Sequence, residues 1–518
     1  MRRYDFAIVG YGPTGATLAN LLCRLGYRIV VIDQAREIYP KPRAITADHE
    51  ALRAFQACGL AETIAAGAIP HPGTDYLGTR GQLIKKFYPM ASTPPLAWEP
   101  TFMFVQPELE AVLREGIQDD PLADFRLGLA LARFSPSEEG VTLVLEDGSE
   151  LEAAWLLACD GGRSAVRRQL DVGIEDLAFD ENWIVIDAHL RGDTALPARC
   201  VQYCRPERPG TYIVGPGPLR RWEIKMLPGE TPEDFQTEAA LRKVLRTFVD
   251  DTGLEIVRTA IYRFHALVAR RWRSGRVFLL GDAAHQMPPF MGQGLCAGVR
   301  DAFNLAWKLD KVMRHGADDA LLDSYEAERK PHAKAVVAHA KRFGLIIGEL
   351  DREAAERRDA ALEAELASGQ AETVRQRFIP DLEQGLIDLD AAGRPQRGAG
   401  ELFVQPWVRA AEGEWRRLDD VVGFDFLIAV TDAQVLQTLP EALLSQWRHR
   451  QGSLVTIGAG GLAERDGLFA QWMQRHRARA VVVRPDRYVY GSAADGAALS
   501  ELMSRLLHGV WQPSLTLE

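Results

Sequence analysis

Two glycine-rich segments, at residues 10–15 and 281–294, constrain this chain more than any other feature of its sequence. The first has glycine at positions 10, 12 and 15, and the second begins Gly281-Asp282-Ala283-Ala284-His285. Each segment alone is ordinary, because a plain turn between a strand and a helix can carry it. Together they predict one dinucleotide that is held from two distant parts of the chain.

The first segment lies between a predicted strand and a predicted helix. Residues 4–9 form a short apolar run, residues 16–25 show the leucine spacing of a helix, and a second strand over residues 28–32 ends at Asp33. Glycines let the backbone approach a pyrophosphate, the helix N-terminus offers N–H groups, and an acid can accept hydrogen bonds from a ribose. The residues expected to contact the dinucleotide here are Gly10, Gly12, Pro13, Thr14, Gly15 and Asp33.

The second segment indicates that the dinucleotide is FAD and not NAD, a distinction that the first segment does not make. An apolar strand over residues 276–280 is followed at once by Gly281 and Asp282. A carboxylate at that strand end can accept from a ribityl hydroxyl, which a nicotinamide dinucleotide lacks. A helix then opens at residues 292–295, and its N-terminus can face a flavin ring. The residues expected at the flavin here are Gly281, Asp282, Pro288, Gly292, Gln293, Gly294 and Leu295.

Three further signatures complete a family pattern: Cys159-Asp160-Gly161-Gly162-Arg163-Ser164, Pro42-Arg43-Ala44, and Gln106 before Pro107. With them, the chain resembles the FAD-dependent aromatic hydroxylases, the class A flavoprotein monooxygenases with the fold of p-hydroxybenzoate hydroxylase. The resemblance spans residues 1 to about 340. It implies that Asp160 serves FAD and the pyridine nucleotide, that Arg43 contacts the FAD pyrophosphate, and that Gln106 touches the flavin.

Within that family the chain is most similar to 3-(3-hydroxyphenyl)propionate hydroxylases. The stretches that carry this likeness lie at residues 42–45, 182–185, 226–231, 301–309 and 320–325. They are mainly scaffold and cofactor segments, so they identify relatives better than they identify a substrate. The chain is also short for that subgroup after residue 345.

The resemblance implies a reaction cycle in which NADH or NADPH reduces FAD, O2 forms a flavin C4a-hydroperoxide, and a phenolic ring receives one oxygen atom. The protein must position the ring, exclude water and help to ionise the phenol. Candidates for catalysis are His49, Tyr212 and Pro289, and candidates for substrate binding are Tyr203, Tyr212 and Arg221. Strand alternation sends about half of such residues to the wrong face, and a helix-surface position explains His49 equally well.

The predicted fold class is α/β: a Rossmann-like FAD-binding domain with an inserted antiparallel-sheet substrate domain and a thioredoxin-like C-terminal domain. The expected boundaries are 1–175 and 266–347 for the FAD domain, 176–265 for the insertion, 348–397 for a helical linker, and 398–518 for the last domain. No cysteine follows Cys296, so thiol redox chemistry is excluded from that last domain. Packing or dimer support is its expected role.

The composition and charge of the chain limit the classes of partner that it can bind. A net charge of −10 and a pI near 5.7 argue against nucleic acid and anionic membrane, and no apolar run approaches a membrane span. Six scattered cysteines and the lack of a signal peptide favour the cytoplasm. No cluster has metal-ligand spacing, so no metal is expected. A homodimer is left open.

Other interpretations of the function stay open at this point. Resorcinols, hydroxybenzoates and polycyclic phenols are alternative substrates, including in biosynthesis. A flavoprotein oxidase, dehydrogenase or halogenase of the same fold is a second class, although the Trp-x-Trp-x-Ile-Pro signature of halogenases is absent. A non-enzymatic flavin-binding module is a third.

Overall fold

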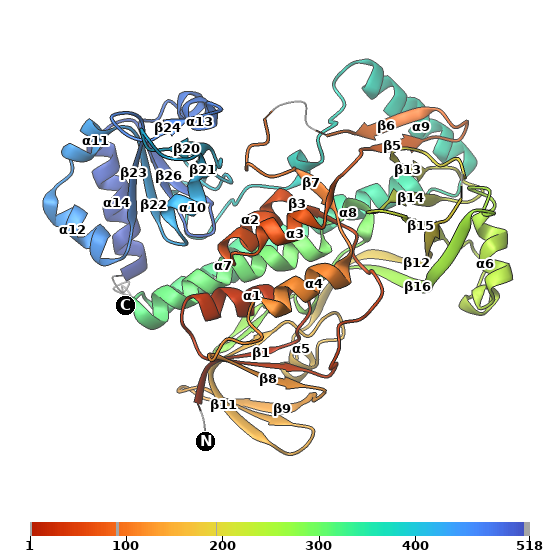
Figure 1. Cartoon of the computed structure of the whole chain (residues 1–518), viewed down its shortest axis with the longest axis horizontal. Coiled ribbons are helices and arrows are strands. Elements are labelled where there is room, and N and C mark those ends of the chain that lie inside the picture. Colours follow the sequence, from red (N-terminus) through yellow and green to blue (C-terminus); the bar gives the residue numbers. More distant parts are fainter. Residues whose placement is uncertain (1–2, 90–92, 193, 512–518) are drawn as a thin grey trace.

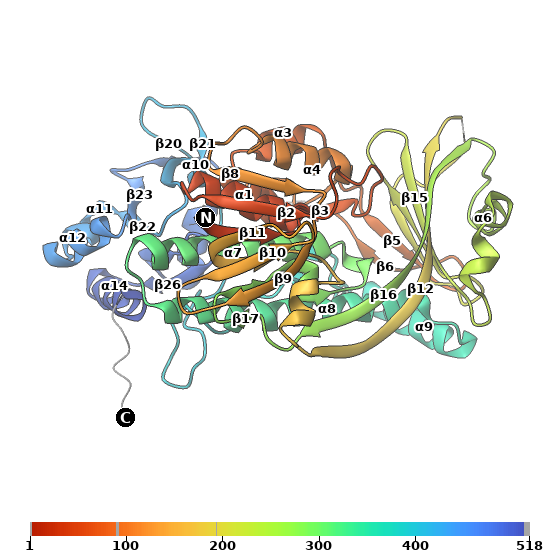
Figure 2. The same ribbon diagram turned by 90° about the horizontal axis from the view of Figure 1, so that it is seen from below.

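The computed structural model describes residues 3–89, 93–192 and 194–511. Its body is built on two eight-stranded sheets. In Figure 1 the first sheet lies at the bottom, the second lies at the right, and the C-terminal unit lies at the left. Figure 2 shows the same order along the long axis from below.

The first sheet has a parallel centre, because β1 pairs with β2 and β11, β2 pairs with β8, and β11 pairs with β18, all in the parallel sense. Its strands, in spatial order, are β17 (Arg273–Ser274), β18 (Val277–Leu279), β11 (Glu150–Ala158), β1 (Arg3–Val9), β2 (Ile29–Asp33) and β8 (Ala123–Leu127), with β10 (Val141–Leu145) and β9 (Leu131–Pro136) paired beyond β11. The apolar runs of the central strands β1, β2, β11 and β18 are buried, as is typical of parallel strands covered on both faces.

Parallel strands end at the same edge of a sheet, and this edge assembles the cofactor segments. Gly10 follows β1, Asp33 ends β2, Asp160 follows β11 and Gly281 follows β18. Residues far apart in the chain therefore meet because their strands are neighbours. The structure therefore places at one sheet edge the two distant segments that the sequence predicts to hold one dinucleotide.

Helices pack on this sheet and on one another around it. They are α1 (Pro13–Arg24), α2 (His49–Ala57), α3 (Ala61–Ala66), α4 (Gln106–Glu115), α5 (Ala165–Gln169), α7 (Gly294–Arg314) and α8 (Asp323–Gly348). The long helix α7 runs through the middle of the molecule beside α1 (Figure 1). Its residues 296–311 are all buried, so it forms the central support of the fold. A small sheet of β3 (Thr46–Asp48), β7 (Thr101–Met103) and β4 (Ile69–Pro70) lies at the start of α2.

The second sheet is largely antiparallel and contains the strands of the insertion predicted over residues 176–265. Its order is β19 (His285–Gln286), β16 (Leu254–Ala269), β12 (Ile174–Leu190), β15 (Leu219–Lys225), β14 (Gly210–Val214), β13 (Cys200–Tyr203), β5 (Thr74–Leu77) and β6 (Leu83–Phe87). Strands β5 and β6 belong to the segment expected to be purely FAD-binding, and β5 pairs with β13 in parallel. Helix α6 (Glu238–Leu245) covers the outer face.

The charge-rich segment after residue 348 is helical only over α9 (Arg352–Ala367), and a single 3-10 turn, η5 (Arg375–Phe378), follows it. The C-terminal unit has a four-stranded sheet in the order β23 (Ser453–Ala459), β22 (Leu427–Asp432), β25 (Ala480–Val483), β26 (Val489–Ala493), and a small sheet of β20 (Trp407–Arg409), β21 (Arg416–Arg417) and β24 (Ala463–Glu464). Its helices are α10 (Leu418–Val422), α11 (Ala433–Gln437), α12 (Glu441–His449), α13 (Leu468–His476) and α14 (Gly496–Trp511).

The C-terminal unit packs on α7 and α8 through buried charges and aromatic rings. Glu328 on α8 pairs with Lys308 on α7 at 2.6 Å and with Arg484 of the C-terminal unit at 2.7 Å, and all three side chains are fully buried. Trp307 meets Phe426 edge to face, with ring centroids 5.3 Å apart. Removing one partner of such a buried pair would leave the other charge buried without a partner, which is strongly destabilising.

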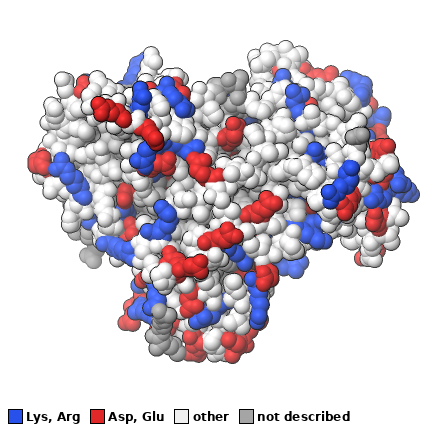
Figure 3. Space-filling view, viewed as in Figure 1, with Lys and Arg blue, Asp and Glu red and all other residues white. Residues whose placement is uncertain are grey.

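Acidic and basic side chains are interspersed over the face of the molecule seen in Figure 3. Among the residues that the structure describes, no helix combines the length and apolar character needed to cross a bilayer.

Candidate active site

A cavity of about 1340 Å³ lies between the two sheets and takes its walls from both. Typical sites for one small ligand measure ~300–1,000 Å³, so this cavity has room for a large cofactor together with a second molecule. Most residues predicted to hold FAD line it: Gly10, Gly12, Pro13, Thr14, Asp33, Arg43, Gln106, Asp160, Asp282, Gly292, Gln293, Gly294 and Leu295.

The loop before α1 fits a pyrophosphate. A Cβ atom on Gly10, whose φ is +99°, would overlap the carbonyl oxygen of Cys159, and one on Gly15 would overlap that of Gly10. A Cβ on Gly12 would meet nothing within 4 Å, so the space in front of the helix is open. Helix α1 begins at Pro13 without a side-chain cap, which leaves its first N–H groups for an anion.

Asp33 is fixed at the end of β2 by its own backbone neighbours. Its two carboxylate oxygens accept hydrogen bonds from the N–H groups of Tyr11, at 2.6 Å, and Ala35, at 2.7 Å. The carboxylate is half-buried at the cavity wall and keeps lone pairs for ribose hydroxyls. This geometry fits the role that the motif predicts.

The second segment meets the first at Thr14. A Cβ atom on Gly281, whose φ is +57°, would lie 2.8 Å from the Thr14 hydroxyl oxygen, and one on Gly298 of α7 would overlap the same oxygen. Gly281 is therefore a contact point between the two segments, whereas Gly15 packs on Gly10 of its own segment, and neither glycine lines the cavity. The neighbouring Asp282 side chain is exposed to the cavity. The protein that encloses Asp282 raises the pKa of its carboxyl, while His285 and Arg43 oppose that shift.

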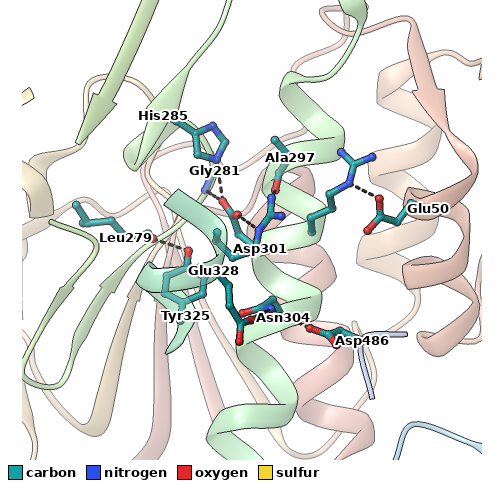
Figure 4. Close-up of polar contacts among 12 residues, drawn as sticks. Glu50, Leu279, Gly281, His285, Ala297, Asp301, Asn304, Tyr325, Glu328 and Asp486 are labelled. Carbon is teal, nitrogen blue, oxygen red and sulfur yellow. Dashed lines mark hydrogen bonds and ion pairs between the residues drawn. The ribbon is translucent and has the colours of Figure 1, made fainter. Parts of the chain in front are cut away.

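A buried carboxylate on α7 holds the Gly281 turn in place (Figure 4). Asp301 accepts the N–H of Gly281 at 3.0 Å, lies 2.9 Å from Nε2 of His285, and pairs with Arg329 at 2.9 Å. Burial opposes ionisation of Asp301, but His285 and Arg329 lower its pKa, so it stays charged. His285 thus supports the turn and is not among the residues that line the cavity.

Asp160 and Gln106 shape the cavity wall through backbone contacts. Asp160 Oδ2 accepts from the N–H groups of Ala165, at 2.7 Å, and Val166, at 3.1 Å, at the start of α5. Gln106 accepts from the N–H of Ala44 at 2.5 Å and donates to Glu110 at 2.6 Å. Both residues therefore position loops beside the predicted cofactor.

The loop before α7 brings backbone to the cavity. Pro289 lines it, whereas Pro288 is buried behind it. Gly292 has a φ of +64°, and a Cβ there would lie 3.1 Å from Thr46 Cβ, so the tight turn needs glycine. Helix α7 then begins at Gly294 without a side-chain cap.

The comparisons with known proteins agree with this geometry. Residues 3–340 match the family described as FAD binding domain, and residues 400–509 match the HcaD C-terminal domain. The chain is 33% identical over 529 residues to the 3-(3-hydroxy-phenyl)propionate/3-hydroxycinnamic acid hydroxylase of Klebsiella pneumoniae (strain 342), covering 96% of this chain and 94% of that one. It is 32% identical over 524 residues to the Escherichia coli O157:H7 protein of the same name, with the same coverage.

The chain belongs to the FAD-dependent aromatic hydroxylases. Solved structures share its fold. The crystal structure of the flavin-dependent monooxygenase PieE in complex with FAD and substrate covers 98% of this chain and 99% of its own, with a TM-score of 0.81 at 22% identity. Aklavinone-11 hydroxylase with FAD and aklavinone gives a TM-score of 0.78 at 26% identity, covering 97% of this chain and 99% of its own. FAD is therefore the cofactor of this hydroxylase.

Two of the residues predicted to bind the substrate point away from the cavity. Tyr212 on β14 and Tyr203 on β13 do not line the cavity of the hydroxylase. Their rings pack on the far face of the sheet, Tyr212 against Trp222 at 5.2 Å and Tyr203 against Phe248 at 5.1 Å. Side chains alternate along a strand, so the neighbouring Thr211 takes the cavity-facing position.

His49 and Arg221 also need correction. His49 is buried at the start of α2 and lines a second cavity of about 300 Å³ towards the C-terminal unit, away from the predicted flavin. Arg221 does line the main cavity, but its guanidinium is engaged: it donates to Asp187 at 2.6 Å and to the carbonyl oxygens of Arg43, at 2.5 Å, and Pro42, at 2.7 Å. It secures the Arg43 loop of the hydroxylase and has little capacity left for a substrate.

The sequence analysis missed a polar row on the sheet wall. Glu223, Thr211 and Gln202 lie side by side on β15, β14 and β13 and line the cavity. Thr211 Oγ1 donates to Gln202 Oε1 at 2.5 Å. Burial raises the pKa of Glu223, although Arg221, 3.9 Å away, opposes the shift. Counting by twos from Arg221 would have placed Glu223 on the cavity face.

Proposed function

We propose that this hydroxylase uses NADH or NADPH and O2 to hydroxylate a phenolic acid of the 3-(3-hydroxyphenyl)propionate type, in aromatic catabolism. The observation that carries the proposal is the single cavity shared by the FAD residues and the polar row Glu223–Thr211–Gln202. The curated relatives, named for that substrate and for 3-hydroxycinnamic acid, support it. Bound FAD supplies the redox and oxygen chemistry, and the chain supplies orientation and exclusion of water.

The residues divide this work by position. Pro289 and the turn at Gly292 place rigid backbone at the start of α7, where it can border the flavin and limit water. Glu223 replaces His49 and Tyr212 as the candidate that accepts the phenol hydrogen bond, because it is the carboxylate of the polar row. Arg43 is half-exposed at the cavity wall and is our candidate for guiding NAD(P)H.

The larger organisation follows the same proposal. We assign residues 1–175 and 266–347 to FAD binding, together with the β5–β6 hairpin's contribution to the substrate wall, and 176–265 to the inserted sheet. Residues 348–397 are a linker, and 398–518 form a thioredoxin-like domain that supports α7 by packing. A cytoplasmic location agrees with six free cysteines.

Cofactor consumption with a panel of phenols tests the proposal. We expect 3-(3-hydroxyphenyl)propionate to stimulate NADH or NADPH oxidation by the FAD-loaded enzyme, with isotope from labelled O2 in the product. Resorcinol and 3-hydroxybenzoate should stimulate less. Stoichiometric H2O2 with no label in the ring would instead indicate an oxidase, and a protein that takes up no FAD would end the proposal.

A further inference from the structure

On the substrate side of the active-site cavity, an arginine lies without an acidic partner in the part of the chain that the structure describes. Arg375, on the turn η5, lines the cavity beside Thr74 and Cys200. Its Nη2 donates to Thr74 Oγ1 at 3.1 Å, and its guanidinium carbon lies 5.9 Å from the centre of the Phe87 ring. Among the residues that the structure describes, no carboxylate lies within ion-pair distance of it.

The other arginines on the sheet wall are already paired. Arg221 and Arg258 share the buried Asp187, at 2.6 and 2.9 Å, and Arg263 pairs with Asp180. Burying a guanidinium without a counter-charge is unfavourable, and burial accordingly lowers the pKa of Arg375. An anion that enters the cavity would remove this penalty, so the site favours a negatively charged ligand.

Further donors surround the guanidinium. Thr74 accepts from Arg375, which leaves its own hydroxyl proton to donate. His71 accepts the N–H of Gly73 on Nδ1 at 3.0 Å, so its neutral ring carries the proton on Nε2. Burial and the nearby Arg375 lower the pKa of His71 well below its usual range and keep the ring neutral. Two neutral donors and one cation suit a carboxylate.

The turn that carries Arg375 is anchored by the residues that follow this arginine. The next residue, Gln376, donates to the carbonyl oxygen of Pro100 at 2.7 Å and to Thr101 Oγ1 at 2.6 Å. Phe378 packs edge to face on Phe343, with centroids 5.2 Å apart. The guanidinium is thus held in place before a ligand arrives, which favours binding.

We propose that Arg375 binds the carboxylate of the substrate and selects aromatic acids whose acid group is set off from the ring by a short chain. The inference rests on the proposed function and names its specificity residue. Arg375 is held against Thr74 on β5, whereas Glu223 is on β15, and β14 and β13 lie between them. Three strand spacings amount to about 14 Å. A phenol hydroxyl at Glu223 and a carboxylate at Arg375 need a tether longer than the direct bond of a hydroxybenzoate.

The test compares Arg375→Gln with Arg377→Gln, in FAD-loaded protein. Arg377 lies on the same turn, is exposed, and pairs at the surface with Glu372, so it controls for changes to the turn itself. Binding is read from the flavin absorbance change as ligand is added, and turnover from NADH oxidation. The ligands are 3-(3-hydroxyphenyl)propionate, its uncharged alcohol 3-(3-hydroxyphenyl)propan-1-ol, and 3-hydroxybenzoate.

We expect Arg375→Gln to weaken binding of the propionate by roughly 10- to 100-fold while affinity for the alcohol stays the same, with FAD content unchanged. Arg377→Gln should match the wild type with every ligand. Arg375→Lys, which keeps the charge but loses the fork geometry, should fall between. It also serves as the test variant if Arg375→Gln does not fold.

Two failures are distinguishable. If the wild type neither binds nor turns over any of the three phenols, the proposed function itself fails. If the wild type hydroxylates the propionate and Arg375→Gln, or in its place Arg375→Lys, keeps the same preference for the acid over the alcohol, the function stands and the role of Arg375 is overturned.

Discussion

Thr14 and Gly281 touch across the cofactor site: the Thr14 hydroxyl oxygen lies 2.8 Å from the point where a Cβ on Gly281 would sit. Gly298 on α7 approaches the same hydroxyl even more closely. The N-terminal loop and the turn after β18 thus form one surface, and the absence of two side chains allows it. Any side chain at these glycines would act on FAD binding by separating the two segments.

Gly298→Ala should therefore destabilise the holoenzyme by about 1–3 kcal/mol and reduce retained FAD, because its methyl group would overlap the Thr14 hydroxyl. Thr14→Ala removes that oxygen, so the double variant should recover most of the lost stability. Thermal unfolding and the ratio of flavin to protein absorbance measure both effects. Strictly additive losses in the double variant would show that the two residues do not interact.

Two glycines of the same loop should respond differently to alanine. Gly12→Ala adds a methyl group in open space before α1, so it should lower FAD affinity by obstructing the phosphate approach and leave the apoprotein's unfolding temperature nearly unchanged. Gly15→Ala places a methyl group on the Gly10 carbonyl oxygen, so it should destabilise the apoprotein itself. Equilibrium dialysis with FAD and melting curves of the apoproteins separate these outcomes. Equal melting temperatures for the two variants would contradict the assignment.

Asp282→Ala should reduce FAD affinity while the fold is retained. The Asp282 side chain projects into the cavity, and no hydrogen bond or ion pair joins it to another side chain among the residues that the structure describes. A ribityl hydroxyl bound to a carboxylate contributes roughly 1.5–3 kcal/mol, or about 10- to 100-fold in affinity. Asp282→Asn, which keeps one acceptor oxygen, should lose less. Flavin titration monitored by fluorescence quenching gives the constants, and full FAD occupancy of the alanine variant at limiting flavin would refute the ribityl contact.

The sequence was informative about the cofactor because motif glycines and strand-end acids have fixed places relative to parallel strands. Asp33, Asp160 and Asp282 all follow from the order of strand, turn and helix, and the structure brings them to one cavity. The contact between Thr14 and Gly298 was not predictable, since nothing in a helix interior identifies a glycine that faces another segment.

The substrate wall was harder to predict because a strand assignment does not fix which face its side chains take. A shift of one position separates Thr211, in the cavity, from Tyr212, in the core. Arg375 lies outside any strand, in the segment predicted to be a helical linker, and only the tertiary fold brings it to β5. Arg221 was predicted to bind the substrate. It lines the cavity, but its pairing with Asp187 depends on the strand register and could not be predicted.

Two substitutions on the sheet that forms the substrate wall test the corrected assignment of its side chains. Tyr212→Phe should leave turnover and coupling unchanged, because the ring lies on the face packed under α6. Glu223→Gln should lower kcat by about 10- to 100-fold if the carboxylate accepts the phenol proton. In the wild type, kcat should rise with pH as Glu223 ionises, and the variant should lack this rise. Stopped-flow oxygen-transfer rates across pH provide the measurement. A Glu223→Gln enzyme with the wild-type pH profile would exclude that role.

Acid stability offers a test of His49 that does not depend on activity. Burial, reinforced by Arg300 and Arg53 against the opposing Asp48, lowers the pKa of His49 from 6.5 to about 4. Between those values the unfolded chain binds a proton that the native state does not, so stability falls as the pH drops from 6.5 towards 4. This one group accounts for about 3 kcal/mol of that loss.

His49→Gln should consequently reduce the difference in unfolding free energy between pH 7.5 and pH 4.5, whatever its effect at pH 7.5 alone. Part of the acid sensitivity should persist, because burial also lowers the pKa values of His71 and His332. Urea unfolding at the two pH values, with FAD in excess, measures the difference, and the exposed His449→Gln serves as the control. If both variants lose stability with acid as steeply as the wild type, His49 takes up its proton equally in the native and unfolded states, and burial does not lower its pKa.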